Sequence, residues 1–308
     1  MTASALRSRL LLSPTLALVL VAVVWGLTYP LTGALLRFLP VTQLLALRFG
    51  LAALVLLPAV LRARPSWQVL LAGVGLGAVQ ALEFGTLTAG LALTSPGRAA
   101  FLVSLSVVLV GALEALLSCR RPSREMVGTV LLLALGLGLL TRPGSGGGWA
   151  LTLGDGLCLA CALFTALQVV LTGRLVQRRD GHPPLLPGVL VGVQAGTVAA
   201  VYGAVTWLMP GKQSLEWAAG PVGLGVLGGL ILLAMLATVL ALLAQTWAQG
   251  RVSAGRVAVI YTLEPVVAAL VSVLWLGEQF APMQVVGGVL ILAVQFIGPM
   301  REQERHPG

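Results

Sequence analysis

Long apolar runs alternate with short polar breaks along the whole chain. Most runs reach the roughly 17–25 residues that a helix needs to cross the hydrocarbon layer of a bilayer. There are ten such runs, at about residues 15–36, 41–61, 67–92, 97–118, 126–141, 153–175, 185–208, 219–248, 253–276 and 281–300. They are too long and too continuously apolar for barrel strands, and the other structure that can span lipid is the helix. The pattern therefore predicts an all-α polytopic membrane protein with ten transmembrane helices.

The composition agrees with lipid as the main solvent. Of 308 residues, 58% are hydrophobic and 9% are charged, whereas a soluble domain carries about a quarter charged residues. The breaks between runs are too short to hold an extramembrane domain. We therefore expect function to reside within the helix bundle or at its mouths.

Basic residues at the ends of the runs predict the orientation. With a cytoplasmic N-terminus, fourteen arginines fall on the inner side, four basic residues fall on the outer side, and Arg48 remains inside the second run. An excess of Arg and Lys on the cytoplasmic side is the usual rule. The net charge of +9 is thus spread over span ends and forms no patch for nucleic acid. We expect both termini in the cytoplasm and a multi-pass protein of the plasma membrane; the Arg-, Ala-, Gly- and Val-rich composition is typical of a bacterial inner membrane protein from a GC-rich genome.

A six-residue pattern, Ser-x-Gly-Arg-x-Ala, opens two of the runs. The copies lie 158 residues apart and consist of Ser95, Gly97, Arg98 and Ala100, and of Ser253, Gly255, Arg256 and Ala258. Five runs separate the starts of the two copies, so the copies should lie on opposite sides of the membrane. This predicts two inverted five-helix repeats, residues 1–148 and 149–308, an architecture of many secondary transporters. Arg98 and Arg256 oppose the helix dipole, and we interpret them as interfacial anchors, with gate contacts as the alternative.

Several motifs carry a resemblance to a known family. They are Tyr261 to Ala269 followed by Leu276-Gly277-Glu278, Gln245 to Gln249, Trp25-Gly26, Arg48-Phe49, and Gly90 to Thr94. Together they resemble EamA-type transporters of the drug/metabolite transporter superfamily, over nearly the whole chain. The resemblance implies ten helices, alternating access and export or exchange of small metabolites. One departure is that Ser106-Val107 stands where the first repeat of such proteins carries its proline, so the two half-sites are expected to differ.

Three ionisable residues lie deep inside predicted spans: Arg48, Glu83 and Glu264. Each would cost about 2.5–3.5 kcal/mol in contact with lipid, so we expect them to face the bundle interior. Glu83, with Gln80 on the same helix face, could bind a substrate amine, carry a proton, or form a structural pair with Arg48. Arg48 in turn could bind a carboxylate, pair with Glu83, or extend toward the membrane surface.

The ninth and first spans supply further candidates. Glu264 precedes Pro265 and shares a face with Tyr261, which suits either a substrate site at a kinked helix or a hinge. Polar and aromatic side chains form a stripe along the first span, which suits either a cavity wall or packing; they are Trp25, Thr28, Tyr29 and Thr32. We predict a cavity lined by the first, second, third, eighth and ninth spans.

The sequence offers little for a metal, a cofactor or an enzyme. Cys158 and Cys161 form a C-x-x-C pair inside an apolar run and are interpreted as core residues, while His182 and His306 lie outside the runs. No nucleophile–base arrangement is visible within the spans. An intramembrane enzyme and a structural or accessory membrane subunit, whose centre would be dry, remain as alternatives.

The interpretation that fits best is a secondary transporter for amino acids or related amphipathic compounds. We expect no cofactor and no metal. Export is favoured by the resemblance alone. Coupling to protons through Glu83 or Glu264 is a hypothesis motivated by the depth of these carboxyls in the bilayer.

Overall fold

The computed structural model describes residues 13–117, 128, 131–132, 135–136, 138–139, 151–177, 186–209 and 220–305. All regular elements in these ranges are helices: α2 (Pro14–Leu35), α3 (Val41–Ala63), α4 (Trp67–Leu91), α5 (Pro96–Val103), α6 (Ser106–Leu117), α8 (Leu153–Val176), α9 (Pro187–Leu208), α10 (Gly220–Leu232), η2 (Leu233–Leu240), α11 (Ala241–Gln249), α12 (Ala254–Tyr261), α13 (Leu263–Leu276) and α14 (Pro282–Arg305). Eight helices or joined helices are long and apolar enough to cross a membrane. They match eight of the ten predicted runs. The tenth run corresponds to α14, and the fifth, at 126–141, lies largely outside the described residues.

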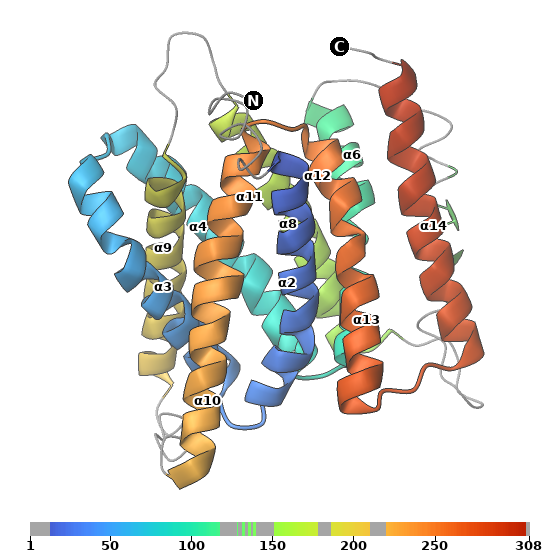
Figure 1. Cartoon of the computed structure of the whole chain (residues 1–308), viewed down its shortest axis with the longest axis horizontal. Helices are drawn as coiled ribbons and strands as arrows, with labels where there is room; N and C mark the ends of the chain where they lie inside the picture. The colour runs from blue at the N-terminus through green and yellow to red at the C-terminus, as the bar shows by residue number, and fades with distance from the viewer. Residues whose placement is uncertain are drawn as a thin grey trace, which may run out of the picture.

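Helices from the two halves of the chain pack together closely. The first-half helices α3 and α4 pack on α9 and α8, and α2 packs on α13 and α11. In Figure 1, α3 and α9 lie at one edge of the bundle and α14 at the opposite edge. The interior of the bundle is therefore built from both halves.

Two spans are broken at positions that lie 158 residues apart. The eight-residue helices α5 and α12 are followed by α6 and α13 after interruptions at Ser104 and Thr262. Each of these residues donates a side-chain hydrogen bond of 2.7 Å to the carbonyl three residues earlier, Ser104 to Phe101 and Thr262 to Val259. Because the first break occurs without a proline, the hydroxyl rather than Pro265 is the feature that the two breaks share.

A third span contains a segment of π-helix, η2, flanked by α10 and α11. The hydroxyl of Thr238 donates to the carbonyl of Leu233 at 2.9 Å, five residues earlier. Such segments are rare and are frequent at functional sites. No proline or glycine occurs in Leu233–Leu240, so the apolar pattern gave no sign of it.

Helices α2 and α13 approach each other closely at Gly26. A Cβ at this position would lie 2.7 Å from the Cβ of Val267 and 2.8 Å from the carbonyl oxygen of Glu264. We expect Gly26→Ala to lower stability by about 1–3 kcal/mol, because the two helices must separate. Thermal denaturation in detergent micelles measures the loss. Gly50→Ala, where nothing lies within 4 Å, is the control, and equal melting of the two variants would contradict the close packing.

Candidate functional site

A cavity lies inside the bundle, between helices of both halves. The space between its lining atoms is about 720 Å³, open solvent included. Its walls come from α2, α3, α4, α5, α6, α8, α12 and α13. The predicted set of lining spans was wrong in part. The fourth and sixth predicted spans also line the cavity, whereas the eighth, which contains η2, does not. Residues of η2 instead accept hydrogen bonds from two lining residues, Trp25 and Arg48.

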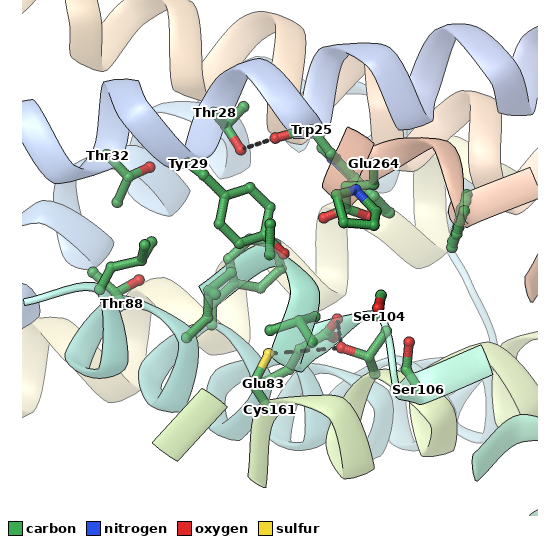
Figure 2. A pocket seen from close by; sticks show the side chains of 18 of the residues that line it. Trp25, Thr28, Tyr29, Thr32, Glu83, Thr88, Ser104, Ser106, Cys161 and Glu264 are labelled. Carbon is green, nitrogen blue, oxygen red and sulfur yellow. Dashed lines mark hydrogen bonds between the residues drawn. The ribbon is translucent and has the colours of Figure 1, made fainter. Parts of the chain in front are cut away.

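The polar stripe of α2 faces this cavity. Trp25, Thr28, Tyr29 and Thr32 all line it (Figure 2). The indole Nε1 of Trp25 donates to the carbonyl of Ala237 in η2 at 2.9 Å, and its ring lies edge-on to the ring of Tyr261 with centroids 5.3 Å apart. Residues from the second half of the chain therefore fix the position of the indole. The stripe as a whole lines the cavity.

Two carboxyl groups enter the cavity from different helices. Glu83 on α4 accepts a 2.9 Å hydrogen bond from the hydroxyl of Thr165 on α8, and Glu264 on α13 lines the cavity together with Tyr29. The two carboxyls are close enough for their charges to interact. When both are ionised they repel each other, so the arrangement favours a cation between them or a proton on one of them.

Arg48 does not form the pair with Glu83 that the sequence allowed. It is 3% exposed, and its Nε donates to the hydroxyl of Thr238 in η2 at 2.8 Å. Its guanidinium carbon lies 4.7 Å from the ring centroid of Phe84. The ion pair between Arg98 and Asp155 lies elsewhere. Arg48 is therefore a buried cation in the cavity wall with no carboxylate partner among the described residues, and it does not extend to the membrane surface.

The remaining predicted residues divide. Tyr261 lines the cavity, and its buried hydroxyl has no hydrogen-bond partner among the described residues. Gln80 is fully buried and lies outside the cavity wall, on a helix whose neighbouring positions Gly77 and Ala81 contact α9. The structure thus brings six of the seven predicted residues together.

Several lining residues were not predicted. The hydroxyls of Thr88, Ser104, Ser106 and Thr165 face the cavity together with Cys161. Ser106 could have been predicted as a lining residue from the sequence, because Ser106 lies 158 residues before Glu264, at the same spacing as the two motif copies. The two cysteines of the C-x-x-C pair have different surroundings. Cys161 lines the cavity, whereas Cys158 packs against Gly90, where an added Cβ would lie 2.7 Å from the sulfur of Cys158.

The first Ser-x-Gly-Arg copy, at the start of α5, forms hydrogen bonds with carboxylates from two other parts of the chain. The hydroxyl of Ser95 and the backbone N–H of Gly97 both donate to the carboxylate of Glu278, and Arg98 donates to both oxygens of Asp155 at 2.8 and 2.6 Å. We call these five residues the α5 clasp. It joins α5 to the start of α8 and to the connection between α13 and α14.

Asp155 takes part both in the α5 clasp and in the cap of α8. The N-cap of α8 is Thr152, and Asp155 completes a capping box with it while pairing with Arg98. Asp155 is fully buried, so its charge depends on these partners.

The second motif copy, at the start of α12, has different surroundings. Arg256 is exposed, and no carboxylate pairs with it among the described residues. An added Cβ at Gly255 would meet nothing within 4 Å, whereas at Gly97 it would meet Phe280 at 2.5 Å. The first copy of the motif is therefore packed against other residues, whereas Gly255 and Arg256 of the second copy are not.

Comparison with known proteins gives consistent relatives. The chain is 28% identical over 286 residues to an "Uncharacterized transporter" of Archaeoglobus fulgidus, with 93% of this chain and 85% of the relative covered. It is also 28% identical over 283 residues to a "Probable amino-acid metabolite efflux pump" of Salmonella typhimurium, covering 90% and 92% of the two chains. A solved crystal structure shares the fold with a TM-score of 0.67 and 19% identity, covering 95% of this chain and 98% of the other. The model of the EamA-like transporter family matches residues 12–142 and 152–297. The sequence motifs, the apolar helices and this match agree, and the chain belongs to the EamA-like transporter family.

Proposed function

We propose that this membrane transporter exports amino acids or related amphipathic metabolites across the plasma membrane by alternating access. The observation that carries the proposal is the cavity lined by helices of both halves, whose walls hold two carboxyls and an arginine with no ion-pair partner among the described residues. Six residues would contact the substrate or the coupling ion: Trp25, Tyr29, Arg48, Glu83, Tyr261 and Glu264. The name of the Salmonella relative supports the substrate class and the direction.

The architecture we propose is ten spans in two inverted repeats, residues 1–148 and 149–308. Helices α5 and α12 support it, because they coincide residue for residue at the spacing of 158 and end at equivalent hydroxyls. Glu278, which follows α13, meets Gly97 near the start of α5. Since α12 leads into α13, α12 begins at the opposite end of the bundle. The two segments matched by the family model fit the same division.

The orientation we propose places both termini in the cytoplasm, on the count of arginines. The α5 clasp then lies at the outer end of the cavity. Alternating access would require its contacts to form and break during each cycle. The cytoplasmic side carries the second motif copy.

A structural or accessory subunit is disfavoured by the interior. Such a protein would not need charged groups in a hollow centre, and each of these groups is costly to bury. A cavity whose arginine has no carboxylate partner in the described part of the chain is therefore better explained by a ligand.

A ligand-induced thermal shift screen tests the proposal. Purified protein would be screened against amino acids, nucleosides and organic cations, and a true ligand at about 100 times its Kd should raise the melting temperature by on the order of 5 °C. The shift should be lost in Trp25→Ala and Glu83→Gln. It should remain in Trp207→Ala, whose side chain is 76% exposed at the end of α9.

The outcomes are distinguishable. A shift that persists in both cavity variants would place the ligand elsewhere. Reconstituted protein that moves none of the panel compounds across proteoliposomes would overturn the transport proposal itself.

A further inference from the structure

We propose that Arg48, positioned by Thr238 of η2, binds the carboxylate of the transported substrate. The substrate class is then a zwitterion with one carboxylate and one amine, as in a free amino acid. This inference rests on the proposed function and specifies the chemistry of the same cavity.

The charge of Arg48 is not balanced by a carboxylate among the described residues. A buried cation is normally paired with an anion, because an unpaired one costs several kcal/mol. Here the partners are a neutral hydroxyl and an aromatic ring, at 2.8 Å from Nε and 4.7 Å from the guanidinium carbon. The Nη2 atom is buried and has no hydrogen-bond partner among the described residues. The site is therefore incomplete until an anion enters.

The π-helical segment η2 orients the guanidinium of Arg48. The hydrogen of the Thr238 hydroxyl is used on the carbonyl of Leu233, so the oxygen is left as an acceptor for Nε of Arg48. With Nε occupied, the Nη1–Nη2 edge is the part of the guanidinium that remains for a ligand. That edge matches the two oxygens of a carboxylate. The π-helical turn thus acts as a positioning device for the arginine.

The rest of the cavity favours a ligand that also carries a positive group. Glu83 and Glu264 line the same space as Arg48, and together they favour a positive group. They disfavour a dianion such as a phosphate, because one arginine cannot compensate two negative charges beside two carboxyls. A ligand with one carboxylate and one amine fits both ends, and the rings of Trp25 and Phe84 can contact its side chain.

The test compares matched sets of compounds that differ in one charged group. One set is L-leucine, L-leucinamide, 3-methylbutylamine and 4-methylpentanoate; the other is L-phenylalanine, L-phenylalaninamide, phenethylamine and 3-phenylpropanoate. Dissociation constants are measured by calorimetry on the purified full chain. We expect the wild type to bind at least one amino acid about tenfold or more tightly than its amide, because the amide lacks the charge that Arg48 would meet.

Variants assign this preference to individual groups. In Arg48→Met the ratio of the affinity for the acid to the affinity for the amide should fall to within about twofold of one. Thr238→Val should reduce the ratio partly, since the arginine remains but loses its positioning bond. Arg62→Met, an equal change at an exposed site on the same helix, should keep the wild-type ratio. Glu83→Gln should instead reduce the preference for the amino acid over the carboxylate that lacks the amine.

Three results would overturn the inference. They are equal binding of acid and amide by the wild type, an unchanged ratio in Arg48→Met, and failure of both amino acids to bind. If another compound, such as an amine without a carboxylate, is then transported, the zwitterion site is refuted and the transporter proposal stands. If no compound is transported, the proposed function fails as well.

Discussion

Glu83→Gln and Glu264→Gln are each expected to reduce pH-gradient-driven accumulation of substrate in proteoliposomes at least tenfold, to near background. The two carboxyls interact within one cavity, so binding of a cationic group by one should depend on the protonation of the other. A carboxyl that holds either a substrate amine or a proton provides a simple coupling between the two. Glutamine keeps the shape and the hydrogen-bonding capacity but cannot change its charge. Glu264→Gln should therefore retain substrate exchange without a gradient while losing the response to the gradient, whereas Glu83→Gln, which also loses the carboxylate for the substrate amine, should lose both.

The control is Glu114→Gln, a carboxyl on α6 that does not line the cavity. It should behave like the wild type in both assays. Wild-type accumulation that does not respond to a pH gradient would rule out proton coupling. Accumulation that remains gradient-driven in both glutamine variants would show that the coupling group lies elsewhere.

Most of the transmembrane helices could be predicted, because each one depends on the apolar residues of its own segment and the same pattern recurs along the chain. A run of about twenty apolar residues has few structures available in lipid, so its length nearly determines the helix. The second and third spans illustrate this, with predicted ranges of 41–61 and 67–92 against observed helices Val41–Ala63 and Trp67–Leu91. The stripe on α2 was also predictable, because residues 25, 28, 29 and 32 share a face at helical spacing.

The partners of the buried charges could not be predicted in the same way. Arg48 and Glu83 lie on consecutive spans, so an ion pair between them was a reasonable expectation. The observed partner of Arg48 is Thr238, 190 residues away, on a π-helical segment without a sequence signal. Glu278 likewise meets Ser95 and Gly97 across more than half of the chain. Such contacts depend on how the spans pack, which apolar length and periodicity do not specify.

Helical spacing also gave one misleading signal. Gln80 lies three residues before Glu83 and was placed on the same face, but the cavity reaches Glu83 and not Gln80. One face of a helix is wide enough to contact both a cavity and a neighbouring helix. The sequence could identify the face, whereas the position of α9 decided which part of that face is covered.

Removing the contacts of the α5 clasp is expected to make the cavity accessible from the outer side of the membrane. In the double variant Asp155→Asn, Glu278→Gln, a cysteine placed at Thr88 should react with a membrane-impermeant thiol reagent from outside at least tenfold faster. Thr88 lines the cavity near the end of α4 and is 1% exposed. The background for this measurement replaces Cys119, Cys158 and Cys161 by alanine.

The expected size follows from the contacts removed. The clasp contains charge-assisted hydrogen bonds from Arg98 to Asp155 and from Gly97 to Glu278, each contributing about 1.5–3 kcal/mol. Because about 1.4 kcal/mol is a factor of ten in a two-state equilibrium, weakening both should shift the population measurably toward a conformation open at this end. Arg256→Gln at the other motif copy should leave labelling from outside unchanged, since no carboxylate pairs with Arg256 in the described part of the chain. Unchanged labelling in the double variant would show that the clasp supports the fold without closing the cavity, and faster labelling only from the cytoplasmic side would reverse the proposed orientation.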